Sequence, residues 1–106
     1  MVKKFEANNL KIELTSIVQP LFFDPNCPMV KTLVKAYQDV TGDFKHQPES
    51  IGGGTYAKGV NNCIGYGMEF AGDDNHIHDA NEFLKVDDWL LSVEIFCEAI
   101  KNLMEL

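Results

Sequence analysis

VDDWLLSVEIFCEAIKNLMEL, residues 86–106, is the stretch that does most to decide the fold. Its apolar residues recur at helical spacing, and Asp87 or Asp88 is the expected N-cap. The apolar face comprises Leu90, Leu91, Val93, Phe96, Cys97, Ile100, Leu103 and Met104. A helix with such a broad apolar face needs a sheet or a second helix packed against it.

A second amphipathic helix is predicted to begin after Pro28 and to end at Thr41-Gly42. Asp24 or Asn26 is the expected cap, and Gly42 is the expected stop. The apolar stripe that indicates this helix comprises Met29, Val30, Leu33, Val34, Tyr37 and Val40. The sequence thus predicts two main helices.

Two segments have strand patterns. Residues 10–18 alternate apolar and polar side chains before Pro20, and residues 62–70 form a second apolar segment that glycines interrupt. A short extended piece is expected between GDFKHQPES, residues 42–50, and Gly52. The order strand, helix, strand, strand, helix predicts an α/β fold, with a small mixed sheet and two main helices in a single domain, 1–106.

The composition limits the possible partners. The chain is 45% hydrophobic and 24% charged, with a formal net charge of −7, which fits one globular domain. It carries no basic stripe that could face phosphates, so nucleic acid and anionic membrane are poor partners. The amino end lacks a signal-peptide pattern, and no stretch reaches the ~20 apolar residues of a membrane span. We therefore expect a soluble, cytoplasmic chain.

The three cysteines support the same expectation. Cys27, Cys63 and Cys97 are odd in number and far apart, which argues against a disulfide framework or a CxxC zinc site. We expect each to be a small buried apolar residue in a reducing compartment.

SIGGGTYAKG, residues 50–59, contains three consecutive glycines. It is not a P-loop, because Lys58 precedes the last glycine. Gly52, Gly54 and Ala57 fit a dinucleotide-binding spacing, but Gly59 interrupts the helix that should follow. A tight turn at positive φ is one alternative. The other is a site where the amides of Gly53, Gly54 and Thr55 bind an anion such as a carboxylate.

A polar loop follows, with six potential metal ligands: Asp73, Asp74, His76, His78, Asp79 and Glu82. Hard and borderline metals use such side chains. The cluster alone is also compatible with a solvated acidic loop, and neither HExxH nor an EF-hand pattern fits it.

In this order, these segments resemble the carboxyl-terminal portion of the zinc dipeptidases of the aminoacylase, carnosinase and glutamate-carboxypeptidase family, most closely bacterial broad-specificity dipeptidases. The resemblance runs from about Leu10 to the end, through SIGGGTYAK, NCIGYGMEF and His78 followed by NE. Residues 1–19 resemble the last strand of the lid domain. Residues 20–106 resemble the C-terminal segment of the catalytic domain.

The resemblance implies roles for individual residues. His78 would be the last metal ligand of a di-zinc centre, and Gly53, Gly54 and Thr55 would contact the carboxylate of a dipeptide substrate. Asn81 and Glu82 would hold the ligand loop in place rather than bind metal. In the complete enzyme, the reaction implied is metal-assisted hydrolysis of the peptide bond.

The other functional residues of such enzymes are not found in this sequence. The His-x-Asp ligand pair, the bridging Asp, the Glu-Glu pair with the general base, and the lid His, Asn and Arg are all missing. We therefore expect a fragment that is inactive alone and does not hold zinc by itself. The alternative is a non-catalytic, self-associating domain, and we expect the isolated chain to form a homo-oligomer through uncovered apolar faces.

Overall fold

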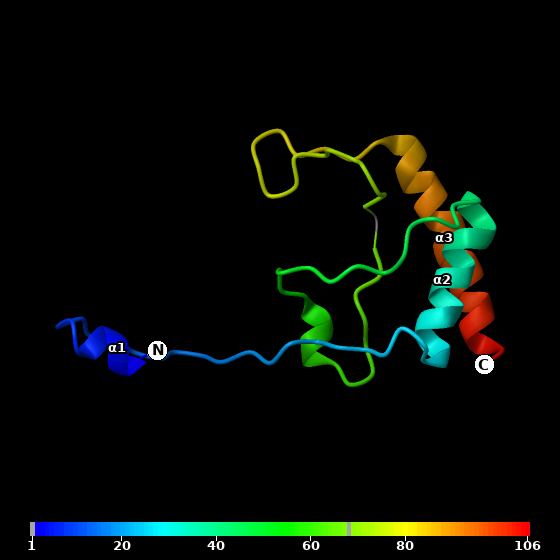
Figure 1. Ribbon diagram of the computed structural model, residues 1–106. Helices are drawn as coiled ribbons and strands as arrows, with labels where there is room; N and C mark the ends of the chain where they lie inside the picture. The colour runs from blue at the N-terminus through cyan, green and yellow to red at the C-terminus, as the bar shows by residue number, and fades with distance from the viewer. Residues whose placement is uncertain (1, 68) are drawn as a thin grey trace.

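The computed structural model describes residues 2–67 and 69–106. These residues form three α-helices, α1 (Val2–Glu6), α2 (Pro28–Thr41) and α3 (Val86–Met104), and one short 3₁₀ helix, η1 (Tyr56–Gly59). Figure 1 shows that α2 and α3 lie side by side and antiparallel. The long segment between them leaves the helix pair, passes through η1 and a polar loop, and returns to the start of α3.

The two predicted helices are confirmed, but their predicted N-caps are wrong. Pro28 occupies the start of α2, and the residue before it, Cys27, makes no side-chain cap. Asp24 instead accepts a hydrogen bond from the amide of Asn26 at 2.8 Å. At the other end Gly42 stops α2 as predicted, with a left-handed φ of 72° and its N–H donating to the Gln38 carbonyl at 2.9 Å.

The N-cap position of α3 is Lys85, again without a side-chain cap, so neither Asp87 nor Asp88 is the cap. Both aspartates lie in the first helical turn, where a negative charge is favoured by the helix dipole. The cap predictions failed because Asp is common both at the N-cap and in the first turn, and sequence spacing alone did not separate the two positions.

The core lies between α2 and α3. Leu33, Ala36 and Ala99 are its centre, and Ala36 and Ala99 expose only 0% and 2% of their surface. Small side chains at this contact let the two helix backbones approach closely, and Met29, Ile64, Tyr66 and Leu103 pack around them. Buried Ser92 is satisfied within α3, because its hydroxyl donates to the Asp88 carbonyl at 2.8 Å.

The predicted α/β fold is wrong for the residues that the structure describes, because they contain no strand and no sheet. Residues 10–18 form an extended segment in which Leu14, Ile17 and Val18 are largely exposed. Residues 43–51 and the described part of 62–70 are also irregular, and Met68 lies outside the described residues. An alternating pattern specifies which face of a strand would be buried, but it supplies no neighbouring strand to pair with.

The molecule is much more open than a compact protein of its size. Its radius of gyration is 18.4 Å, whereas a compact chain of this length has roughly 13 Å. Its accessible surface is 8930 Å², whereas a compact protein of 11.9 kDa exposes roughly 6000 Å². Figure 1 shows the cause: α1 and the central segment extend away from the helix pair.

The cysteines are free thiols, and the prediction that all three are buried is wrong. Cys27 and Cys63 are partly exposed, and Cys97 is exposed on α3. Cys97 lies on the side of α3 that faces away from α2, so it has no core to enter. Among the described residues, no helix has both the length and the apolar character that a membrane crossing requires.

Candidate substrate and metal-ligand loops

The glycine segment leads directly into η1. Thr55 precedes this helix in extended conformation, and its hydroxyl accepts a hydrogen bond from the Ala57 amide at 3.3 Å. Ala57 is buried, which anchors the four-residue helix, and the helix ends at Gly59. The expected interruption at Gly59 is therefore confirmed, and the helix is too short to hold a pyrophosphate in the dinucleotide-binding manner.

Gly52, Gly53 and Gly54 do not use their conformational freedom. The glycines with positive φ in the described residues are Gly42 and Gly72, so the interpretation of residues 52–54 as a positive-φ turn is wrong. A Cβ at Gly52 or Gly54 would meet nothing within 4 Å, and one at Gly53 would only touch the Ile51 side chain at 3.8 Å. Within the described residues, neither packing nor backbone conformation requires glycine at these three positions.

The backbone around these glycines has unused donors. All three predicted contact residues, Gly53, Gly54 and Thr55, are exposed. Within the described residues, their amide groups have no hydrogen-bond acceptor. Free amides can bind a carboxylate, but successive amides converge on one anion when right- and left-handed residues alternate, and no glycine of residues 52–54 has positive φ. The carboxylate contact therefore stays a prediction.

The histidine loop is closed on itself. The Phe83 amide donates to the Asn75 carbonyl at 3.0 Å, and the Asp79 amide donates to the His76 carbonyl at 2.9 Å. Figure 1 shows the result as a narrow yellow loop that projects beyond the start of α3. The edge-to-face contact of His76 with Phe83, with ring centroids 5.7 Å apart, holds the two sides of the loop together.

Three residues in this loop have left-handed backbone conformations that are rare outside glycine. The φ angles are 57° at His76, 61° at His78 and 61° at Asn81. Asparagine and histidine are among the non-glycine residues that adopt this region most often, so the three angles indicate tight turns within the loop.

The two histidines differ in how their rings are held. Nδ1 of His76 lies 3.3 Å from the Ala80 carbonyl oxygen, which can only accept. Because a carbonyl oxygen only accepts, a hydrogen bond here has Nδ1 as the donor. The His78 ring makes no hydrogen bond to any residue that the structure describes, and it is exposed. His76 thus has a ring partner in the described residues and His78 has none, whereas the predicted ligand is His78.

The acidic residues of the loop do not gather into a metal site. Asp73 forms an ion pair with Lys85, whose Nζ also lies 3.6 Å from Asp88 Oδ2. The Lys85 ammonium lowers the pKa of Asp73, and Asp73 in turn raises the pKa of Lys85. In residues 2–67 and 69–106, no three His, Cys, Asp or Glu side chains come together as metal ligands. The donor set in the described residues therefore does not fit a zinc ion.

The glycine segment and the histidine loop are not brought together. No hydrogen bond in the described residues joins them, and Figure 1 shows the histidine loop apart from η1. Asn81 and Glu82, predicted to support the metal ligand, are exposed, and their side chains make no hydrogen bond to the described residues. Their roles, and those of His78 and the glycine segment, stay predictions.

Sequence reasoning missed one polar network at the end of α2. The Tyr37 hydroxyl donates to Asp43 Oδ2 at 2.8 Å, and His46 Nδ1 hydrogen-bonds to the same oxygen. Hydrogen bonds from His46, Tyr37 and the Lys45 amide hold the pKa of Asp43 well below its usual range. The signal that could have found it is Asp43 directly after the helix stop, with His46 three residues later.

Comparison with known proteins finds the chain similar to part of several longer proteins. Over 101 residues it is 37% identical to a Staphylococcus haemolyticus protein named "Putative dipeptidase", covering 95% of this chain and 21% of that protein. A Staphylococcus epidermidis protein of the same name is 38% identical over 97 residues, covering 90% of this chain and 20% of the relative. A Staphylococcus aureus protein with this name is 32% identical over 100 residues.

The chain spans about a fifth of the length of these relatives. No family model and no solved structure matches the chain. A 101-residue match within 106 residues includes both the glycine segment and the histidine loop. The chain is therefore homologous to one segment, about a fifth in length, of proteins named as dipeptidases.

Proposed function

We propose that this chain is one segment of a metal-dependent dipeptidase and that it contributes two elements to the site. The glycine segment binds the substrate carboxylate, and His78 supplies one metal ligand. The observation that carries the proposal is the 37% identity over 95% of the chain with a protein named as a dipeptidase. The ordered resemblance of the glycine, NCIGYGMEF and His78-NE segments supports the same function.

The chemistry of the glycine segment suits the terminal carboxylate of a dipeptide. Gly53, Gly54 and Thr55 offer free amides on an exposed backbone with no side chain at two of the three positions. Each hydrogen bond to a charged acceptor contributes roughly 1.5–3 kcal/mol before desolvation. A dipeptide has its carboxylate one residue from the scissile bond, so a fixed carboxylate site also selects the length of the substrate.

Zinc is the metal that the resemblance implies, and this chain would supply only part of its site. A catalytic zinc takes three protein ligands in general, and the described residues bring no such set together. The remaining ligands and the general base would come from other parts of a complete dipeptidase. Asn81 and Glu82 would restrain the loop that carries His78, and the left-handed backbone at His78 and Asn81 is compatible with this role.

A segment exchange tests the function. Residues 10–106 of this chain replace the matching segment of the Staphylococcus haemolyticus relative, and dipeptide hydrolysis is measured beside the unmodified relative and the 106-residue chain alone. We expect hydrolysis in the exchanged protein and none in the 106-residue chain. A folded exchanged protein without activity, beside an active parent, would contradict the proposal. So would turnover that co-purifies with the isolated chain.

Gly54→Ala in the exchanged protein tests the carboxylate contact. The new Cβ has open space in the structure, so the fold tolerates it while the approach of the substrate is obstructed. We expect KM for a dipeptide to rise about tenfold, the equivalent of one lost hydrogen bond to a charged group. Gly67→Ala, which also has open space, is the matched control and should leave KM unchanged.

A further inference from the structure

Lys85 lies at the junction between the histidine loop, residues 73–84, and α3. Its Nζ donates to Asp73 Oδ1 at the beginning of the loop and lies 3.6 Å from Asp88 Oδ2 in the first turn of α3. The other ion pairs in the described residues join side chains three or four positions apart, whereas Lys85 and Asp73 are twelve positions apart. Lys85 therefore joins the two ends of the loop to each other and to the helix.

A lysine is locally unfavourable at this position of a helix. Lys85 is the N-cap residue of α3, where Ser, Thr, Asp or Asn would accept from a free amide, and it makes no side-chain cap. The positive end of the helix dipole also disfavours a cation there. A residue that breaks local helix rules indicates that another part of the structure requires it. Here the contacts of Lys85 with Asp73 and Asp88 compensate for the unfavourable position.

The two carboxylates that face Lys85 are partly buried. Asp73 and Asp88 expose 21% and 24% of their side chains, whereas Lys85 exposes 53%. The hydrogen bond from Lys85 lowers the pKa of Asp73. Removal of the Lys85 ammonium would leave two negative charges close together without a cation between them, which disfavours this arrangement. The positive charge of Lys85 therefore holds Asp73 near the first turn of α3.

The loop continues the same pairing inward. The Phe83 amide donates to the Asn75 carbonyl at 3.0 Å, so residues 75 and 83 form the next pair after residues 73 and 85. Figure 1 shows the two sides of the loop running together toward α3. The bond between Phe83 and Asn75 closes the loop but does not reach α3. The side chain of Lys85 therefore fixes the closed loop relative to the helix.

We propose that Lys85 is a positioning residue that holds the histidine loop in a fixed orientation against the first turn of α3. The loop carries His78, which the proposed function assigns to the dipeptidase site, so the consequence for catalysis rests on that function. Residues of a functional site must be held within about 0.5 Å and 10–20° of their productive geometry. The bridge from Asp73 through Lys85 to Asp88 is a property of this chain, and it can be measured without any activity.

Amide hydrogen exchange of Phe83 in the 106-residue chain tests the bridge. Lys85→Met keeps the length of the side chain and removes its charge, whereas Lys85→Arg keeps the charge. We expect the Phe83 amide to exchange roughly threefold faster in Lys85→Met, with unchanged helical circular dichroism, and at the unmodified rate in Lys85→Arg. In ~1 M NaCl the difference should disappear, because salt screens an exposed ion pair but not apolar packing.

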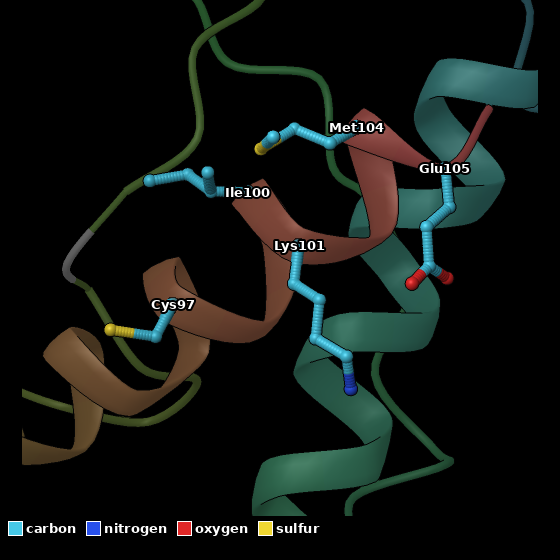
Figure 2. A pocket seen from close by; sticks show the side chains of 5 residues that line it. All are labelled: Cys97, Ile100, Lys101, Met104 and Glu105. Carbon is cyan, nitrogen blue, oxygen red and sulfur yellow. The ribbon is translucent and has the colours of Figure 1, made fainter.

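Lys101→Met is the matched control. Lys101 also lies on α3, but its partner Glu98 is on the same helix, with Nζ 3.7 Å from Glu98 Oε2. Figure 2 shows Lys101 projecting from α3 among the residues that line a pocket near the end of the helix. This variant should leave the exchange of Phe83 unchanged. Equal exchange in Lys85→Met and the unmodified chain would overturn the proposal, as would an acceleration that persists in high salt.

The segment-exchanged dipeptidase tests the consequence for catalysis. We expect Lys85→Met to lower kcat about tenfold with little change in KM, because the histidine loop loses its orientation while the glycine segment is untouched. Lys85→Arg should restore kcat, and Lys101→Met should not change it. An unchanged kcat in Lys85→Met, in an active segment-exchanged protein, would overturn the positioning role. A segment-exchanged protein that is inactive with Lys85 in place would contradict the proposed function, and the exchange rate of Phe83 would still decide the bridge.

Discussion

Tyr66 is the residue that ties the irregular central segment to the helix pair. Its hydroxyl donates to the Leu33 carbonyl at 2.9 Å, and its ring meets Phe96 edge to face at 5.5 Å. Burial, with a smaller contribution from Tyr37, raises the pKa of Tyr66 to about 12, and only the protonated phenol can donate to Leu33. The contact therefore depends on the protonated phenol.

Alkaline pH should weaken the attachment of this segment. The pKa of Tyr66 is higher in the folded chain than in the unfolded chain. The Tyr66 side chain therefore contributes fully to the free energy of unfolding below the usual tyrosine pKa of about 10, and this contribution is lost as the pH rises toward 12. Y66F should cost about 1 kcal/mol in urea unfolding at pH 8 and reduce the loss of stability at pH 11. Y56F, at a fully exposed tyrosine, is the control. If Y66F and Y56F changed the free energy of unfolding equally, Tyr66 would not be the residue that attaches the central segment.

Acid should weaken the network at the end of α2. The pKa of Asp43 is held below its usual range by His46, Tyr37 and the Lys45 amide, so the stability it contributes is present above the usual pKa of about 4 and is lost as pH falls below it. We expect D43N to reduce the difference in unfolding midpoint between pH 6 and pH 3. E49Q, at an exposed glutamate nearby in sequence, should leave that difference unchanged. If the unfolding midpoint of D43N fell between pH 6 and pH 3 as much as that of the unmodified chain, the Asp43 network would not be the source of the loss of stability in acid.

At the scale of elements, the helices could be predicted from sequence and the strands could not. Helical periodicity, Pro28 and Gly42 are local signals, and they gave α2 almost to the residue. Residues 10–18 carry an equally clear alternation, but a strand is stable only beside another strand, and none is present in the described chain. The predictions of the two N-caps were wrong because acidic residues are favourable both at the N-cap and in the first helical turn.

The stop of α2 gives a direct test at this scale. Gly42 adopts φ 72°, which an alanine tolerates poorly, so G42A should lower the free energy of unfolding by about 1 kcal/mol. G59A is the control, because Gly59 has no positive φ and open space at its Cβ, and it should be neutral or slightly stabilising. Thermal unfolding of both variants would measure this difference. A G42A melting curve that matches G59A would mean that the left-handed cap is not needed.

At the scale of the whole molecule, the chain carries candidate site residues without the geometry of a site. Sequence could identify the glycine segment and the histidine loop, because their residue types are local facts. It could not place them relative to each other, since that depends on long-range packing, and the described chain leaves them apart. The excess surface and the match to a fifth of each relative both fit a segment whose site is completed by other parts of a longer protein.

The most direct test of that view is the zinc content of the exchanged dipeptidase with His46→Ala, His76→Ala and His78→Ala introduced separately. His76 has the better supported ring in the structure, whereas the NE motif assigns the ligand to His78. We expect His78→Ala to lose bound zinc and dipeptide hydrolysis together, because metal binding is coupled to its ligands, while the other two variants keep both. Loss of zinc in His76→Ala with zinc retained in His78→Ala would contradict the assignment of His78 and weaken that of the glycine segment.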